Sequence, residues 1–535
     1  MPGGPGLWPF GSRHTSSEIS ITPDALLKRP SPGIAVTQQP MEETMAEPKP
    51  AAGPPSRSGV RRFGDRYQDL IAWSAAMRVI QRGSPFDQLG IEVNGTGNVD
   101  DVVLRSRQGR HHYIQVKWTT HPAEVVDNKY LTSMPKNGKS VLQKFYASWK
   151  LLLRRDDQPP IMELVTNRNL DRTDPLLRLI DGRSDLLNPA ARDASPASAA
   201  GQRINEWALH LACDRDDVLA MLDSLLFKTG LTVSGEEDRA QTLMLANGLL
   251  SDADALARGI DAITKWVLEG RRVVSGDDIT KEVERMRLYA DDPRAVLLVQ
   301  AIDRDPHPED ATIALDWVDL YEGDSPPLRR RPRDPGDWAT MSHDIDRAVT
   351  SIAAQGFTDI VVRGAMRQAT FFTIGARLAQ VTGTTISYVQ HGTPWPSNAP
   401  RIAVPAPEAS ITAVGAGHEL AVAVGMTVDP TSAVTRFINT VNLPVQMLLT
   451  LMPAEGAHDQ SVAGPGEAVA YAQALRNAVR EQLESTPADR IHLFLAGPGG
   501  LALLLGHRWN RLAPTVVYED LGPGRGYVTA FTVAA

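Results

Sequence analysis

The sequence predicts an α/β protein of several domains. At 535 residues the chain is long enough for two to four domains. Its 42% of hydrophobic and 22% of charged residues are ordinary for globular proteins and supply large cores. Short apolar segments alternate with amphipathic ones of helical period, most regularly after residue 294. Strands that alternate with helices indicate parallel, doubly wound sheets.

Composition narrows the cellular setting. The single cysteine, Cys213, excludes a disulfide framework and a zinc site built from cysteines, so a reducing cytoplasm is expected. No run of about 18 apolar residues occurs, which predicts no membrane partner. The first residues lack the charged and then apolar plan of a signal peptide. We therefore expect a cytoplasmic protein.

Composition and periodicity divide the chain into four parts. Residues 1–58 are rich in Pro, Gly and Ser and are predicted to be a disordered tail. Residues 59–185 read as helix, strands, helix and strand, an α/β domain. Residues 186–292 read as a helical connecting module, with acidic residues opening several segments. Residues 293–535 carry the second α/β region.

The segment "NVDDVVLRSRQGRHHYIQVKW", residues 98–118, predicts a β-hairpin with polar residues at its open end. A two-residue turn that includes Gly109 places Asp100 opposite Lys117. A three-residue turn places Asp101 opposite Gln115. Both turns fit the sequence, and in both a carboxylate, an amide and an ammonium group come within reach of one another.

These groups have two interpretations. The ordinary one is a surface salt bridge between Asp100 and Lys117. The functional one is a magnesium site, because a carboxylate with neutral oxygens and water suits a hard divalent cation. A lysine beside such an ion would stabilise charge that develops on a phosphate. Glu92 precedes the hairpin and would add a second carboxylate.

Local charge is compatible with a polyanionic partner. The chain carries a net charge of −8, but residues 60–158 contain 16 Lys and Arg against 10 Asp and Glu. Affinity for nucleic acid follows local phosphate contacts more than net charge. A solvated basic face is the competing explanation.

The C-terminal region carries candidate ligand-binding residues at predicted strand ends. "IHLFLAGPGGLALLLGHRW" reads as strand, turn and helix, and backbone N–H groups near Gly497 and Pro498 would attract phosphate. It matches neither the dinucleotide-binding nor the Walker pattern. Arg363 and Arg367 would meet phosphates. Trp395 would stack on a base or serve as a core residue.

The N-terminal order resembles the PD-(D/E)xK nuclease superfamily. A helix with Gln68, a strand with Glu92, the acids of "NVDDVV" and the "QVK" of "YIQVKW" follow one another as in its Mrr-like branch, where Gln-x-Lys replaces Glu-x-Lys. The resemblance implies a restriction-endonuclease-like core and divalent-metal-dependent cleavage of double-stranded DNA. It implies Asp100, or failing that Asp101, as metal ligand with Gln115, and Lys117 as catalytic lysine.

The C-terminal half resembles the SAVED sensor domains of CBASS antiphage systems, which look like two fused CARF-type, Rossmann-like units. The matching stretches are "ATIALDWVDLYEG", "TDIVVRGAMRQATFFTIGARLA", "TISYVQHGTPW", "IHLFLAGPGGLALLLGHRWN" and "VVYEDL". The resemblance implies a cyclic oligonucleotide ligand, such as a cyclic trinucleotide, made by a partner nucleotidyltransferase. It also implies homo-oligomers that form on ligand binding and activate the nuclease.

Two other functions remain open from the sequence. One is an Mrr-like restriction endonuclease whose C-terminal half recognises DNA directly. The other is a binding scaffold without catalysis, in which the hairpin acids only make surface salt bridges.

Overall fold

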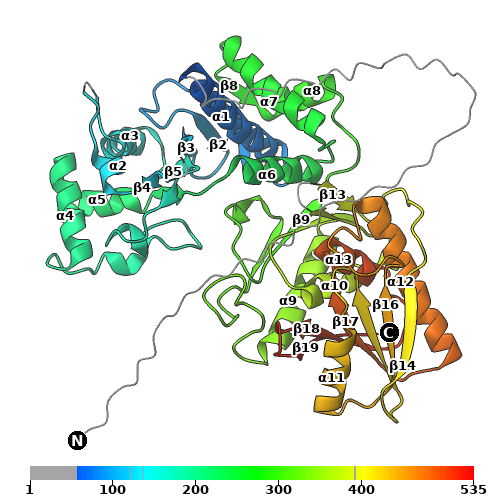
Figure 1. Ribbon diagram of the computed structural model, residues 1–535. Helices are drawn as coiled ribbons and strands as arrows, with labels where there is room; N and C mark the ends of the chain where they lie inside the picture. The colour runs from blue at the N-terminus through cyan, green and yellow to red at the C-terminus, as the bar shows by residue number, and fades with distance from the viewer. Residues whose placement is uncertain (1–56, 122, 137, 391–392, 535) are drawn as a thin grey trace, which may run out of the picture. The chain divides into compact units, whose positions relative to one another are not determined.

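The computed structural model describes residues 57–121, 123–136, 138–390 and 393–534 (Figure 1). The predicted tail, 1–58, lies outside the described residues except for its last two, which begin helix α1 (Arg57–Ile80). In the described part of the chain no helix is long and apolar enough to cross a membrane.

A six-stranded mixed sheet forms the N-terminal part, in the order β7-β5-β3-β2-β1-β8. Strands β1, β2 and β3 are successively antiparallel, and β5 and β7 continue the sheet parallel to β3. The bounds are β1 (Phe86–Ile91), β2 (Val102–Ser106), β3 (His112–Lys117), β5 (Ile161–Thr166), β7 (Leu225–Lys228) and β8 (Val273–Ser275). A separate short pair joins β4 (Val125–Val126) to β6 (Asn169–Leu170).

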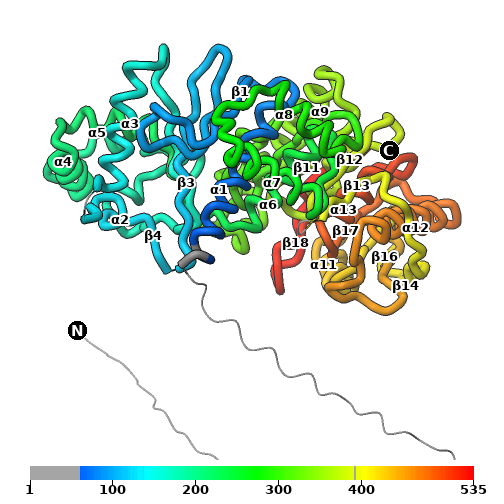
Figure 2. Tube along the Cα trace, turned by 90° about the horizontal axis from the view of Figure 1, so that it is seen from above, coloured from blue at the N-terminus to red at the C-terminus, as the bar shows by residue number. Residues whose placement is uncertain are grey.

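Helices cover both faces of this sheet. Ile114 and Val116 pack in a core with α1, α6 (Val233–Ala246) and α7 (Ala253–Leu268). Tyr113 and Leu164 point to the opposite face, since side chains alternate along a strand. That second core is closed by α2 (Asn128–Thr132), α3 (Val141–Arg155), α4 (Ala199–Leu211) and α5 (Arg215–Leu222). Helix α1 runs beside α6 and α7 (Figures 1 and 2).

Residues 186–292 are not the purely helical module expected from their periodicity. Besides α4 to α7 and α8 (Gly276–Arg285), they supply β7 and β8, which form the two edges of the N-terminal sheet. Strands of four and three residues are too short to show a two-residue alternation among helices. The boundary expected near residue 185 therefore does not separate two cores.

The C-terminal part contains two sheets of the same topology. One has the order β10-β9-β11-β12-β13, and the other has β16-β15-β17-β18-β19 with β14 added beside β16. In each sheet four strands are parallel and the strand after them is antiparallel. The strands are β9 (Ala295–Gln300), β10 (Ile313–Asp316), β11 (Asp359–Arg363), β12 (Thr385–Gln390), β13 (Thr393–Pro396), β14 (Glu408–Ala413), β15 (Glu419–Gly425), β16 (Val445–Met452), β17 (Ile491–Ala496), β18 (Thr515–Asp520) and β19 (Tyr527–Val533).

Two helices join these sheets. They are α10 (Gln368–Arg377), which follows β11, and α13 (Gly499–His507), which follows β17 (Figure 1). A Cβ at Gly375 would lie 2.0 Å from the carbonyl oxygen of Leu503, and a Cβ at Gly506 would lie 2.0 Å from that of Phe372. Only glycine permits this close backbone approach. Helices α9 (Asp337–Ala354), α11 (Thr431–Val441) and α12 (Pro465–Ser485) complete the region.

Candidate functional site

The hairpin adopts the register of the second alternative. Val102 lies opposite Ile114, and Val103 lies opposite Tyr113. Extending this pairing by one residue places Asp101 opposite Gln115, so their side chains lie on the same face. The register that would place Asp100 opposite Lys117 does not occur.

Asp101 is the centre of the polar cluster. Its Oδ2 accepts a hydrogen bond from the backbone N–H of Val116 at 2.7 Å and another from the side-chain amide of Gln115. Lys117 Nζ lies 3.7 Å from the same oxygen. Three consecutive residues of β3 therefore converge on one carboxylate at the open end of the hairpin.

Burial dominates the electrostatics of this pair. It raises the pKa of Asp101, and Lys117 and the two hydrogen bonds offset this only in part, while the charge of Asp100 raises the pKa further. The pKa of Lys117 is lowered, chiefly by burial, with Lys144 of α3 adding to the effect. The positive charge near Asp101 is therefore too small to offset the effect of burial. The carboxyl group ionises less easily than it would in water.

The other two acids from the sequence occupy different places. Asp100 is half-buried and close enough for its charge to act on Asp101. Glu92 lies beside Asp101 in the backbone, with its N–H 3.1 Å from the Asp101 carbonyl oxygen. Its φ of 46° is in the left-handed region, and its side chain forms an ion pair with Arg272. The structure does not bring the Glu92 carboxylate into the cluster.

The chemistry of the cluster fits a magnesium ion held by few protein ligands. It offers one buried carboxylate short of positive charge, a second carboxylate nearby and the amide of Gln115. Among the described residues no three His, Cys, Asp or Glu side chains are grouped so that they could hold a metal ion. The Gln115 amide presents its nitrogen to Asp101, so a cation here would need that amide turned to bring its oxygen forward, with water as the further ligand.

A second candidate site lies where α10 and α13 begin, since Arg367 and Pro498 are the residues before these helices. Gln368 Nε2 donates to the carbonyl oxygen of Gly497 at 2.5 Å. The backbone N–H of Gly500 donates to Gln390 Oε1 at 3.2 Å. The structure therefore brings Arg367, Gly497 and Pro498 to the carboxyl ends of β11 and β17, the end at which open α/β sheets bind ligands.

The aromatic and basic candidates are already engaged with the protein. Trp395 is 4% exposed and packs in the core, where a Cβ on Gly500 would lie 2.8 Å from its ring. Arg367 donates to the carbonyl oxygens of Pro326 and Arg329 at 2.8 and 2.9 Å, and burial lowers its pKa. Arg363 forms a two-pronged ion pair with Asp305, one arm of which is 2.7 Å long.

Three residues near this second site carried too little signal to be found from the sequence. Gln368 and Gln390 make the contacts between the two halves. Glu519, at the end of β18, accepts a hydrogen bond from the N–H of Ala369 at 3.0 Å. Burial raises the pKa of Glu519 to about 7. These three residues share a position in the fold. Gln390 and Glu519 lie at the ends of parallel strands, and Gln368 begins the helix that follows one.

One comparison with known proteins identifies a family in the C-terminal part of the chain. The family model of the "SMODS-associated and fused to various effectors sensor domain" (SAVED) matches residues 342–533. A search of curated protein sequences gave no match.

Similar solved structures include the Acinetobacter baumannii Cap4 SAVED/CARF-domain receptor with the cyclic trinucleotide 3'3'3'-cAAA. It is 14% identical, with 88% of this chain and 99% of that chain covered and a TM-score of 0.40. The Moraxella osloensis Cap4 receptor is 14% identical with the same coverage and a TM-score of 0.39. The family match shows that this chain carries a SAVED domain in its C-terminal part.

Proposed function

We propose that the chain is a sensor-controlled nuclease of antiviral defence. A cyclic oligonucleotide, of the cyclic trinucleotide class, binds the SAVED domain, and the liganded chains oligomerise. The N-terminal domain then cleaves double-stranded DNA with the help of a divalent cation. The observation that carries the nuclease part is the convergence of Gln115, Val116 and Lys117 on Asp101.

The assignment of metal ligands follows from the charge deficit at Asp101. Asp101 and the Gln115 oxygen would hold the ion, and Asp100 would strengthen the local negative potential. Bound Mg²⁺ supplies Lewis-acid stabilisation of the phosphate oxygens and a water of lowered pKa. Burial of the carboxylate keeps competing bulk water away and strengthens its attraction for a cation.

Lys117 would act on the scissile phosphate. Its ammonium group lies 3.7 Å from Asp101 and is 38% exposed, so it is both oriented by the protein and open to a substrate. A cation fixed at this position stabilises the negative charge that develops in the transition state. Lys144, on α3, lies close enough to lower the pKa of Lys117 and would contact the DNA backbone.

The SAVED match and the paired starts of α10 and α13 support the sensor part. Backbone N–H groups at the two helix starts are the kind of donor that binds phosphate. Those of Ala369 and Gly500 now donate to Glu519 and Gln390, which a phosphate group would have to replace. The contacts of Gln368 and Gln390 link the two halves, so a ligand at this point would touch both.

The proposal is tested by incubating the full chain with plasmid DNA, Mg²⁺ and a panel of cyclic di- and trinucleotides. The expected result is linear and then fragmented plasmid with one class of cyclic nucleotide and intact plasmid without it. Cutting that needs no nucleotide would favour a restriction endonuclease that recognises DNA directly. Intact plasmid under all conditions, with a cyclic nucleotide bound, would favour the binding scaffold.

A matched pair of lysine variants separates catalysis from contamination. Lys117→Ala should lower cleavage at least about 100-fold. Lys150→Ala removes a lysine of α3 of similar exposure, 40%, that pairs with Asp217 of α5, and should leave cleavage unchanged. Equal activity of the two variants would contradict the assigned role of Lys117.

A further inference from the structure

A network of charged residues, several of them buried, connects the SAVED side of the molecule to the N-terminal sheet. Its centre is the segment 305–310, which we call the relay loop. Asp310, 1% exposed, accepts from Arg239 of α6 at 2.7 Å, and Arg78 of α1 lies 3.3 Å away. Arg239 and Arg78 outweigh the effect of burial and hold the pKa of Asp310 below its usual range.

At one end the relay loop is tied to the sensor strand β11. Arg363, the last residue of β11, forms its ion pair with Asp305 and lies 3.9 Å from Asp310. Arg363 also lines a cavity of about 310 Å³ with the start of α6 and Val389 of β12. This guanidinium therefore stands between the carboxyl ends of the sensor strands and the relay loop.

At its other end the relay loop reaches the N-terminal sheet. Lys228 of β7 lies 3.5 Å from Glu309, and it also pairs with Asp185 at 3.0 Å. His307 lies 2.8 Å from Glu236 of α6. Lys228 and Glu309 both act on the charge of the fully buried Glu163 in β5.

The network continues to the strand that carries the candidate catalytic residues. Glu163 Oε1 lies 2.8 Å from Nδ1 of His112, the first residue of β3. By register, His112, Glu163 and Lys228 lie on one face of the sheet, and Gln115 and Lys117 of the same strand β3 lie on the opposite face. A shift of β3 against β5 would therefore act directly on the Asp101 cluster.

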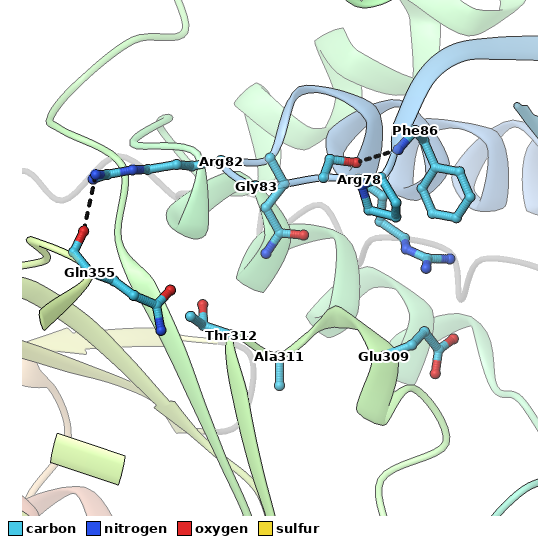
Figure 3. Close-up of a pocket in the computed structure, with 11 residues that line it drawn as sticks. Arg78, Arg82, Gly83, Phe86, Glu309, Ala311, Thr312 and Gln355 are labelled. Atoms are coloured by element: carbon cyan, nitrogen blue, oxygen red, sulfur yellow. Dashed lines mark hydrogen bonds between the residues drawn. The ribbon is translucent and has the colours of Figure 1, made fainter. Parts of the chain in front are cut away.

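The surroundings leave room for the relay loop to move. A cavity of about 230 Å³ lies beside Glu309. Figure 3 shows its lining, with Arg78 and Arg82 of the N-terminal part on one side and Glu309, Ala311 and Thr312 on the other. It is bridged by a hydrogen bond of 3.0 Å from Arg82 to the carbonyl oxygen of Gln355. A segment with a cavity on one side can change position without displacing a packed core.

We propose that the relay loop transmits occupancy of the SAVED domain to strands β5, β7 and β3 of the N-terminal sheet. An anionic ligand that draws Arg363 away from Asp305 leaves a nearly buried carboxylate without its partner, and the loop must rearrange. Because the same loop holds Lys228 and Glu236, that rearrangement reaches the sheet. The inference rests on the proposed function for the identity of its ligand. The coupling between the relay loop and the sheet is a property of the chain without ligand and is tested there.

The test is hydrogen–deuterium exchange on the full chain without any ligand. Asp305→Asn removes the charge that holds Arg363 and should speed amide exchange in β5 and β7 about tenfold or more. Asp344→Asn is the matched control: Asp344 is 17% exposed against 12% for Asp305, it pairs with Arg347, and it lies on α9 away from the relay loop. The control should change exchange in β5 and β7 less than twofold.

A second variant tests the reverse direction, because coupling between two sites is reciprocal. Glu309→Gln breaks the contact with Lys228 and should speed exchange in β11. If Asp305→Asn does not fold, Glu309→Gln alone tests the coupling through the relay loop. Faster exchange confined to residues 303–312 in a variant that folds overturns the relay. Failure of the proposed function is seen separately, as wild-type protein that binds no cyclic trinucleotide and cuts no DNA.

Discussion

The half-buried Asp101 and the buried Asp310 both lie beside cations, yet their pKa values move in opposite directions. Asp101 has one lysine at 3.7 Å, and its pKa is raised. Asp310 has Arg239 at 2.7 Å and Arg78 at 3.3 Å, and its pKa is lowered despite deeper burial. Burial penalises both carboxylates, so the number and distance of the positive charges decide the outcome.

The difference separates two uses of a buried acid. A carboxylate saturated by guanidinium groups has no remaining attraction for an ion, and it serves to hold segments together. A carboxylate left short of positive charge is the one that gains by binding a divalent cation. This contrast is the reason for proposing ion binding at the Asp101 cluster and mechanical coupling at the relay loop.

The largest expected effect is on cleavage. Asp101→Asn should lower the plasmid cleavage that depends on the cyclic oligonucleotide about 10³-fold, because an amide replaces the carboxylate that would hold the ion. Cyclic nucleotide binding, measured by calorimetry, should be unchanged. Folded Asp310→Asn protein should keep part of its cleavage activity. An equal loss of cleavage in the two variants would contradict the difference in role between Asp101 and Asp310.

The next effect is on stability. Asp310→Asn leaves Arg78 and Arg239 buried with fewer partners and should lower the free energy of unfolding by about 3–5 kcal/mol at pH 7. The lowered pKa of Asp310 means that its contribution is present above the unfolded pKa and is lost as pH falls through the folded one. Urea unfolding at pH 7 and pH 3 should show the difference between wild type and variant shrinking in acid.

Glu519 extends the comparison to the SAVED domain. Its pKa of about 7 means that stability falls as pH rises from the usual glutamate range through 7. Glu519→Gln should therefore raise the free energy of unfolding by about 2 kcal/mol at pH 8 and leave it unchanged at pH 4. Glu484→Gln, at an exposed position on α12, is the control that should show no such pH dependence.

The smallest expected effect is that Asp101→Asn costs no stability. The raised pKa of Asp101 means that its ionised form is unfavourable in the fold above the folded pKa, so the variant should be at least as stable as the wild type at pH 8. Mg²⁺ should raise the melting temperature of wild type and not of the variant. A variant that melts lower, with an unchanged response to Mg²⁺, would show that Asp101 is structural.

The alternation of strands and helices was predicted from the sequence, because apolar segments such as those of β17 and α13 are separated by turn residues such as Gly497 and Pro498. Asp101, Gln115 and Lys117 were also predicted as candidate residues. The register that pairs them was left open, because it depends on the length of the turn. The charge network escaped prediction since its members are far apart: Lys228, Asp185 and Glu309 meet only once the chain is folded. Strands β7 and β8 were not predicted either, because strands of four and three residues are too short to show a strand period.

The edge strands β7 and β8 have a consequence for synthesis of the chain. A ribosome that has released the first 185 residues has delivered the hairpin with Asp101 and Lys117, but neither strand that closes the sheet on its two sides. The sheet becomes complete only when residue 275 has emerged, and Asp310, which binds Arg78 and Arg239, follows 35 residues later. Nascent fragments therefore lack the finished sheet, and an expression fragment ending near residue 185 will expose two unpaired sheet edges and aggregate.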